Sequence, residues 1–172
     1  MKIVLIGYMG SGKTTIGKHL AKKSYLPFFD LDSYIESKEK LSITDIFDQK
    51  GEIYFRKIEH RYLKEFIENN DSYVLSLGGG TPCYAGNMNS IKEQIDIHSF
   101  YLQASIPTLK ERLVRNTSRR PLLAQLSEEK LTEYIAKHLF ERRDFYEEAT
   151  HRIKIDSKSV EEVVAEIRIL LH

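Results

Sequence analysis

A glycine-rich segment near the start of the chain constrains the fold more than any other feature. Residues 7–14 read GYMGSGKT and match the pattern G-x-x-x-x-G-K-[ST], between an apolar run at 3–6 and a segment of helical period at 13–23. Glycine lets the backbone wrap closely around an anion, which is then met by backbone N–H groups and by the positive end of the following helix. An ordinary glycine-rich turn seldom has both this pattern and this context, so we predict a phosphate-binding loop.

Segments with the character of buried strands alternate with longer segments of helical period along all 172 residues. This alternation predicts an α/β fold: one three-layer domain over residues 1–172, with a central parallel sheet of about five strands flanked by helices. Strands are expected at 3–6, 27–32, 73–77, 98–103 and 152–155. Helices are expected at 13–23, 33–35 and beyond, 43–47, 55–67 after a break at Gly51, briefly between the third and fourth strands, at 107–114, from Ser127 onward, and from a capping box at Ser159 to Leu171.

The overall charge and the cysteine content exclude several classes of function. Lys and Arg number 26 against 25 Asp and Glu, so there is no global basic footprint for nucleic acid. Cys83 is the only cysteine, which excludes an internal disulfide and paired-thiolate zinc sites, and the six histidines lack metal-ligand spacing. The apolar run at 3–6 is too short for a signal peptide or a membrane span. We expect a cytoplasmic monomer without nucleic-acid or membrane partners.

Two acids stand at the tip of the second expected strand. Asp30 and Asp32 would face bound phosphate or substrate, because ligands bind outside the carboxyl ends of strands in open parallel sheets, and a spacing of two puts both on one side of an extended chain. The alternative is that Asp32 or Ser33 caps the next helix and Asp30 is a solvated loop acid. The phosphate loop favours the first interpretation, since a magnesium nucleotide needs an acidic partner.

Two further motifs are ambiguous when taken alone. Arg56 and Glu59 lie three apart on a helix, a spacing that is most often a solvated surface pair. The glycines at 78–80 follow a strand and allow either close approach to a ligand or a plain flexible turn. Neither choice is decided by local sequence.

Arginine clusters occur at two places in the second half of the chain. Arg119 and Arg120 lie in a polar segment that interrupts the periodic pattern of hydrophobic residues. Residues from about 115 to 126 are predicted to form a mobile lid. Arg142 and Arg143 lie on a late helix, where such a pair is usually solvated. Cys83 lacks an accompanying His and Asp constellation and is interpreted as structural.

Taken in order, these motifs resemble those of the shikimate kinase family across nearly the whole chain. The matching segments are GYMGSGKTT at 7–15, FDLD at 29–32, IF at 46–47, GE at 51–52 with FRKIE at 55–59, LGGG at 77–80 and RPLL at 120–123. The resemblance implies a small P-loop kinase that transfers phosphate from ATP to shikimate, giving shikimate 3-phosphate on the route to chorismate and the aromatic amino acids. Mg²⁺ would accompany ATP, and both substrates are small molecules.

The same resemblance implies a role for individual residues. Implied catalytic residues are Lys13, Asp32 and Arg120. Implied ATP-binding residues are Gly10, Ser11, Gly12, Lys13, Thr14, Thr15, Arg115 and Arg120. Implied shikimate-binding residues are Asp32, Arg56, Gly78, Gly79, Gly80 and Arg142. Implied Mg²⁺ ligands are Thr14 and, through water, Asp30.

Two segments depart from the family pattern. The usual Arg-x-Pro-x-Tyr reads RRDFY at 142–146, so either Arg142 or Arg143 could bind substrate, and spacing to Tyr146 favours Arg142. The loop at 156–159 is short, and no adenine contact is assigned there.

Alternatives to the shikimate kinase interpretation are another small-metabolite or nucleotide kinase of this fold, such as a gluconate kinase, and a nucleotide-binding switch without catalysis.

Overall fold

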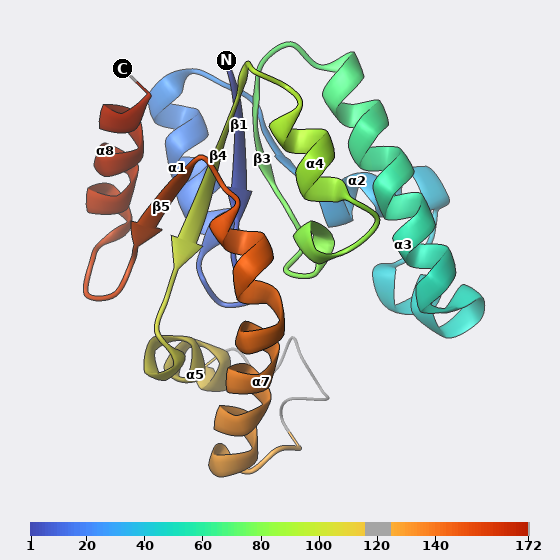
Figure 1. Ribbon diagram of the computed structural model, residues 1–172, viewed down its shortest axis with the longest axis vertical. Helices are drawn as coiled ribbons and strands as arrows, with labels where there is room; N and C mark the ends of the chain where they lie inside the picture. The colour runs from blue at the N-terminus through green and yellow to red at the C-terminus, as the bar shows by residue number, and fades with distance from the viewer. Residues whose placement is uncertain (116–124, 172) are drawn as a thin grey trace.

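The structure, a computed structural model, describes residues 1–115 and 125–171. Five parallel strands form a single sheet in the order β2-β3-β1-β4-β5, with helices on both sides (Figure 1). The strands are β1 (Lys2–Ile6), β2 (Phe28–Asp30), β3 (Tyr73–Ser76), β4 (Ile97–Gln103) and β5 (His151–Lys154). The predicted α/β fold class and the parallel sheet are confirmed.

Helices connect consecutive strands and extend beyond the last one. The α-helices are α1 (Lys13–Ser24), α2 (Leu31–Glu39), α3 (Ile43–Asn69), α4 (Asn87–Lys92), α5 (Ile106–Arg115), α7 (Glu128–Glu147) and α8 (Val160–Leu170), and Thr81–Cys83 form a short 3-10 helix, η1. Ser127 caps α7, and the predicted capping box of Ser159 and Glu162 begins α8. Helix starts with such caps are encoded locally, which is why the sequence located them correctly.

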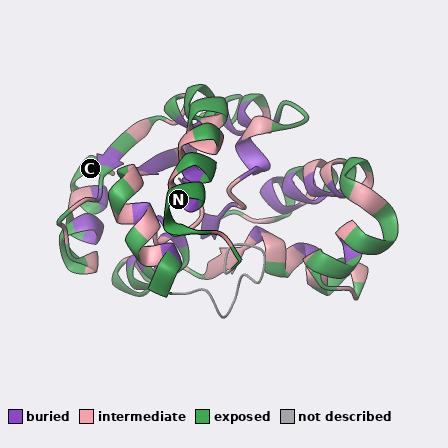
Figure 2. Ribbon diagram, turned by 90° about the horizontal axis from the view of Figure 1, so that it is seen from below, coloured by how far each residue is buried: buried purple, intermediate pink, exposed green. Residues whose placement is uncertain are grey.

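The side chains of β1 show which helices cover each face of the sheet. A Cβ added at Gly17 of α1 would lie 3.1 Å from Leu5 Cδ1, so α1 packs closely on the face that Leu5 occupies. Ile6 points the opposite way, and its register partner Tyr101 contacts the ring of Tyr146 on α7, with centroids 5.2 Å apart. The helices α1 and α7 therefore cover opposite faces, and Figure 2 shows the buried residues gathered between such layers.

The central position of β1 determines where the phosphate loop lies. Residues 3–6 are fully buried, as expected for a parallel strand covered on both faces. From β1 the chain crosses to β2, returns to β3 beside β1, and then crosses to β4 on the other side of β1. Connections on the two sides of β1 diverge at its carboxyl end, which is where open α/β sheets bind their ligands.

The junction of β2 and α2 corrects one prediction. The second strand ends at Asp30, and its carboxylate Oδ1 accepts a hydrogen bond of 3.2 Å from the backbone N–H of Ser33, which makes Asp30 the cap of α2. Asp32 belongs to the first turn of the helix rather than to the strand. The cap was expected at Asp32 or Ser33, and the extended spacing proposed for the two acids was wrong because the helix begins two residues earlier than expected.

Helix α3 is interrupted at the glycine that predicted a break. Gly51 has φ 82° and ψ 169°, outside the helical range, and joins a first segment that begins at Ile43 to a second that ends at Asn69. Only glycine adopts this conformation readily. The break joins two segments that both contact α2, the first through Ile43 and Glu36 and the second through Tyr62 and Glu39.

The segment 116–124 contains Arg120 and most of the predicted lid, and it lies outside the described residues. The elements that flank it are α5, which ends at Arg115, and α7, which begins at Glu128. Within the described ranges, none of the helices is long and apolar enough to cross a bilayer.

Candidate active site

A cleft of about 480 Å³ opens at the carboxyl ends of the central strands. It is lined by the phosphate loop with the first turn of α1, by Asp30 and Asp32, by residues 76–79, by Arg112 and by residues 158–160. The structure thus places segments far apart in sequence around one space. The predicted site residues that line it are Gly10, Gly12, Lys13, Thr14, Thr15, Asp30, Asp32, Gly78 and Gly79.

The phosphate loop has the backbone geometry that its glycines predict. Gly10 and Gly12 have φ of 83° and 91°, in the left-handed region that side chains disfavour. The Nζ atom of Lys13 donates hydrogen bonds to the carbonyl oxygens of Gly7, at 2.7 Å, and Tyr8, at 3.1 Å. These bonds hold a buried ammonium group inside the curve of the loop, at the N-terminal end of α1, where an anion is favoured.

Thr14 and Asp30 supply hard oxygen donors beside this loop. Thr14 is exposed at the start of α1, and its side chain shares the cleft with the Asp30 carboxylate. Mg²⁺ in kinases is held by one or two such oxygens together with waters and substrate phosphates. The donor set fits a magnesium nucleotide, and among the described residues no group of three or more His, Cys, Asp or Glu forms a separate metal cluster.

Asp32 has the chemical character of a proton acceptor. Burial, reinforced by the negative charges of Asp30 and Glu59, raises the pKa of Asp32 to about 6 from its ordinary 3.8, while Lys13 opposes the shift. A carboxylate with this pKa is ionised at neutral pH but binds a proton more readily than a solvated aspartate. It is therefore suited to accept the proton of an attacking hydroxyl.

The turn at Gly78 to Gly80 brings three charged side chains from three helices together. A Cβ added at Gly78 would lie 3.1 Å from Asp32 Oδ1, and one at Gly79 would lie 3.6 Å from Arg142 Nη1. One at Gly80 would lie 2.7 Å from Arg56 Nη2. The acid of α2 and the arginines of α3 and α7 thus approach one glycine turn. The interpretation of residues 78–80 as only a flexible turn is therefore excluded.

Arg56 and Glu59 are not a surface pair. Glu59 is 1% exposed, and its Oε1 accepts a 3.0 Å hydrogen bond from Arg56 Nη1 while its Oε2 accepts one of 2.8 Å from Thr81 Oγ1. The guanidinium carbon of Arg56 lies 3.9 Å from the centroid of the Tyr84 ring. Glu59 therefore fixes both the arginine and the first residue of η1, which follows the glycine turn.

Arg142 and Arg143 differ sharply in their surroundings. Arg142 is partly buried against the turn, next to Tyr146, whose hydroxyl donates a 2.6 Å hydrogen bond to the carbonyl oxygen of Gly79. The side chain of Arg143 is 61% exposed and forms an ion pair of 2.8 Å with Glu147. Arg142 thus lies against Gly79 of the glycine turn whereas Arg143 is exposed, and the assignment of Arg142 as the substrate ligand stays a prediction.

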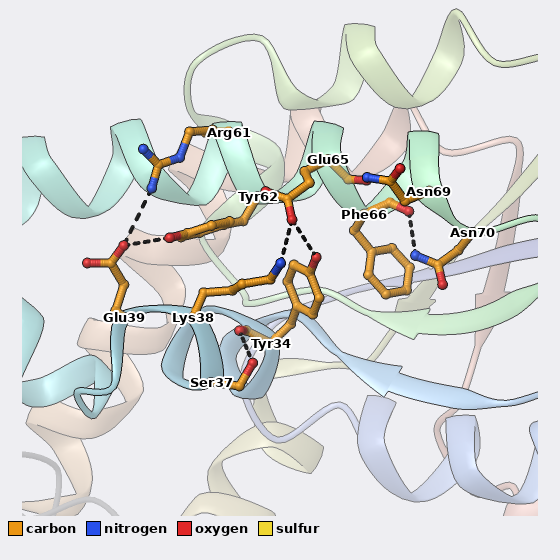
Figure 3. Close-up of polar contacts among 10 residues, drawn as sticks. All are labelled: Tyr34, Ser37, Lys38, Glu39, Arg61, Tyr62, Glu65, Phe66, Asn69 and Asn70. Carbon is orange, nitrogen blue, oxygen red and sulfur yellow. Dashed lines mark hydrogen bonds and ion pairs between the residues drawn. The ribbon is translucent and has the colours of Figure 1, made fainter.

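Polar contacts fasten α2 to the long segment of α3 (Figure 3). The Oε1 atom of Glu39 accepts a 2.7 Å hydrogen bond from Tyr62 Oη. The Oε1 atom of Glu65 accepts from Tyr34 Oη at 3.0 Å and from Lys38 Nζ at 2.6 Å. This network sets the helix that carries the acid against the helix that carries the first arginine.

Two predicted ATP-binding arginines and the thiol of Cys83 complete the set of candidate residues. Arg115 ends α5 with its side chain 74% exposed and paired with Glu111 at 2.6 Å, and it does not line the cleft, so its contact with adenine stays a prediction. Arg120 lies outside the described residues. Burial raises the pKa of the Cys83 thiol to about 11, which keeps it protonated and unreactive at neutral pH.

Sequence reasoning missed Arg112 and residues 158–160 as parts of the cleft. Arg112 Nη1 donates to the carbonyl oxygens of Gly10 and Ser11, both at 3.3 Å, and so joins α5 to the phosphate loop. Residues 158–160 lie at the start of α8 and reach the cleft because β5 lies beside β4. Arg112 is one of two basic residues in the last turn of α5, with Arg115, and local sequence does not distinguish them.

The parallel sheet, the phosphate loop after its central strand and the acid beside that loop together define a P-loop phosphotransferase. Comparison with known proteins gives the particular family. The family model described as shikimate kinase matches residues 9–171, and the chain belongs to the shikimate kinase family.

Individual relatives agree along the whole chain. A shikimate kinase of Flavobacterium johnsoniae is 49% identical over 170 residues, covering 99% of this chain and 98% of the relative. The solved structure of the Bacteroides thetaiotaomicron shikimate kinase has a TM-score of 0.91 at 34% identity, covering 99% of this chain and 98% of that one. That of the Acinetobacter baumannii enzyme in complex with shikimate has a TM-score of 0.86 at 32% identity, covering 99% and 92%. The family resemblance seen in the sequence is confirmed.

Proposed function

We propose that this chain transfers the γ-phosphoryl group of ATP to the 3-hydroxyl of shikimate, in the pathway to chorismate. The observation that carries the proposal is the meeting of Asp32, Arg56 and Arg142 at one glycine turn beside the phosphate loop. Shikimate carries a carboxylate and ring hydroxyls, so its site needs cations at one end and a hydroxyl acceptor at the other. The three side chains provide both.

The arginines bind the carboxylate of the acceptor. A guanidinium group presents a planar fork of donors that pairs with two carboxylate oxygens at once. Arg56 is held by Glu59, and Arg142 lies against Gly79, so both groups are positioned before substrate arrives. Preorganisation of this kind lowers the entropy lost on binding. The backbone of Gly78 to Gly80 closes the pocket between them.

Asp32 orients the reacting hydroxyl and receives its proton. The hydroxyl oxygen forms a bond to the γ-phosphorus as the bond between that phosphorus and the β-γ bridging oxygen breaks, and the hydroxyl proton passes to the Asp32 carboxylate. Products are ADP and the phosphate monoester. The pKa of Asp32, raised to about 6, suits a group that must accept this proton and release it in each cycle.

Lys13 and the loop backbone stabilise the charge that develops on the phosphates. Gly10, Ser11, Gly12, Thr14 and Thr15 surround the nucleotide phosphates with N–H and hydroxyl donors. In such sites positioning and electrostatic stabilisation supply most of the catalysis. Arg120 in the lid segment adds positive charge near the transferring group, and Arg115 binds the adenine side.

Thr14 and Asp30 would hold Mg²⁺, Asp30 through water. The bound ion neutralises negative charge on the β- and γ-phosphates. Asp30 is well placed for this role because one of its oxygens is occupied as the cap of α2, which fixes the orientation of the carboxylate.

We also infer that residues 1–172 work as one kinase domain, monomeric and cytoplasmic, with partners limited to ATP and shikimate. A net charge of +1 gives the chain no general electrostatic attraction for nucleic acid, which supports this inference.

The test of the proposed function is identification of the product. Purified protein with Mg²⁺, ATP and shikimate should give a phosphate monoester whose ³¹P–¹H coupling places it on the 3-oxygen. The Lys13→Ala variant should lose at least roughly 100-fold in kcat, because it lacks the charge that stabilises the transition state. ADP formation without a shikimate ester would contradict the proposal.

A further inference from the structure

Tyr8 is an aromatic residue at a position where the phosphate-loop pattern accepts any residue. Its side chain is 1% exposed, so a large ring with a polar hydroxyl is enclosed beside the loop that binds phosphate. Its carbonyl oxygen accepts a hydrogen bond of 3.1 Å from Lys13 Nζ and another of 3.1 Å from the backbone N–H of Ser11. The backbone of Tyr8 is therefore part of the structure that holds the catalytic lysine.

The side chain of Tyr8 leaves the loop and reaches α7. Its Oη atom lies 3.1 Å from His138 Nδ1, and the two rings are 6.1 Å apart between centroids. The guanidinium carbon of Arg142, one helical turn beyond His138, lies 5.8 Å from the centroid of the Tyr8 ring. Residues four apart share one face of a helix. One side chain of the phosphate loop thus contacts two neighbouring side chains of α7, and one of them is the arginine at the acceptor end of the site.

His138 has a second aromatic neighbour on α7. The ring of Tyr134, one turn earlier on α7, packs edge-on against it, with centroids 4.2 Å apart. A buried tyrosine hydroxyl needs a hydrogen-bond partner, and an imidazole packed in this way offers one in a fixed position. Tyr134, His138 and Arg142 form a row on α7, with Tyr8 packed against its second and third members.

We propose that Tyr8 and His138 are positioning residues that fix the side chain of Arg142 relative to the phosphate loop. The carbonyl group of Tyr8 binds Lys13, and its ring packs against Arg142. One residue therefore contacts both the lysine proposed to bind ATP and the arginine proposed to bind shikimate. His138 anchors Tyr8 to α7. This inference rests on the proposed function, because it assigns Arg142 to acceptor binding.

The test compares steady-state constants for Tyr8→Phe, His138→Leu, His138→Asn and the double variant Tyr8→Phe/His138→Leu. Tyr8→Phe should raise the KM for shikimate roughly 3- to 10-fold, with the KM for ATP and kcat within about twofold of wild type, because the arginine loses its register while Lys13 keeps its backbone contacts. His138→Leu should do the same. His138→Asn, which keeps a polar atom near the position of Nδ1, should restore most of the affinity.

Non-additivity gives the sharpest criterion. The double variant should raise the KM for shikimate no more than either single variant, because both substitutions remove the same hydrogen bond. The double variant removes both members of the hydrogen-bonded pair and leaves neither behind, so it should fold even where a single variant does not. Tyr25→Phe, at a 96% exposed tyrosine that follows α1 as its C-cap, is the matched control and should change nothing.

The outcomes separate this inference from the proposed function. Wild-type protein that turns over shikimate, together with Tyr8→Phe and His138→Leu variants of unchanged KM, overturns the positioning role alone. Equal rises in the KM values of ATP and shikimate, or purely additive effects, also overturn it, since they indicate a general loss of structure. Wild-type protein that shows no turnover with shikimate removes the proposed function and this inference with it.

Discussion

Gly80 and Arg56 are packed so closely that a side chain added to the glycine would displace the arginine. A Cβ at Gly80 would lie 2.7 Å from Nη2 and 3.0 Å from Nη1 of the guanidinium group. Arg56 cannot easily retreat, because Glu59 binds it on one side and the ring of Tyr84 covers it on another. The glycine turn and the arginine therefore define a single surface for the acceptor.

Gly80→Ala should impair acceptor binding without distorting the backbone. Gly80 has φ −89° and ψ −19°, which alanine adopts readily, so the effect comes from displacement of the Arg56 guanidinium. We expect the KM for shikimate to rise by roughly 10-fold, about the effect of a lost charge-assisted contact. The KM for ATP is the internal control. An unchanged KM for shikimate would show that Arg56 does not contact the acceptor.

Asp32→Asn should abolish turnover and at the same time stabilise the protein at neutral pH. In the folded state the pKa of Asp32 is raised to about 6 from 3.8, so keeping the group ionised opposes folding above pH 6. The amide removes that cost, and the expected gain is about 1–3 kcal/mol in unfolding free energy at pH 7 to 8. Because wild-type Asp32 is protonated in both states below pH 3.8, the gain should disappear in acid.

Denaturant unfolding of both proteins from pH 4 to 8 measures this difference. Asp144→Asn, at an exposed acid on α7, is the control and should show no pH-dependent gain. A variant that is inactive but no more stable than wild type at pH 8 would mean that Asp32 is not held in a disfavoured charge state.

Arg142→Lys should raise the KM for shikimate, whereas Arg143→Lys should leave it unchanged. Lysine keeps the positive charge but cannot pair with two carboxylate oxygens at once. At position 142 the KM for shikimate should rise by roughly 10- to 100-fold. At position 143 it should stay unchanged, because that side chain is exposed and paired with Glu147. A loss confined to Arg143→Lys would reverse the assignment of the two arginines.

Glu39→Gln should destabilise the protein in a pH-dependent way. The side chain of Glu39 is 8% exposed, and its carboxylate accepts hydrogen bonds from Tyr62, Tyr54 and Lys50, which lower its pKa below the ordinary 4.5. We expect a loss of about 1–2 kcal/mol at pH 7. The stabilisation by a group of lowered pKa is present above pH 4.5 and is lost as pH falls through the folded-state value, so the difference from wild type should shrink in acid.

Thermal unfolding at pH 7 and at pH 4 or below checks this prediction. Glu166→Gln on α8 is a suitable control, because that carboxylate pairs with Lys158 and its side chain is more exposed, at 39%. A difference that does not change with pH would show that the charge of Glu39 is unimportant to the link between α2 and α3.

The features that sequence predicted well are those encoded locally. The apolar run at 3–6, the glycine pattern after it and the caps at Ser127 and Ser159 each depend on neighbouring residues, and all were located correctly. The start of α2 was misplaced because Asp30 and Asp32 are both competent helix caps, and only the backbone bond from Ser33 distinguishes them.

The burial of Glu59 and the cleft position of Arg112 could not be predicted from local sequence. Both depend on which helix packs against which turn, and a charged residue three or four positions from another is normally at the surface. Glu59 is buried because Thr81 and Arg56 together satisfy its oxygens. Arg112 reaches the cleft because α5 packs against the phosphate loop.

The central claim is that this site phosphorylates shikimate and not another small acceptor. It is tested most directly by coupled ADP release with Mg-ATP in parallel reactions containing shikimate, gluconate, a panel of nucleoside monophosphates, or no acceptor. Turnover that depends on shikimate, with the other reactions near the background without acceptor, is the predicted result. Greater kcat/KM with gluconate or a nucleotide would contradict the roles given to Asp32, Arg56 and Arg142.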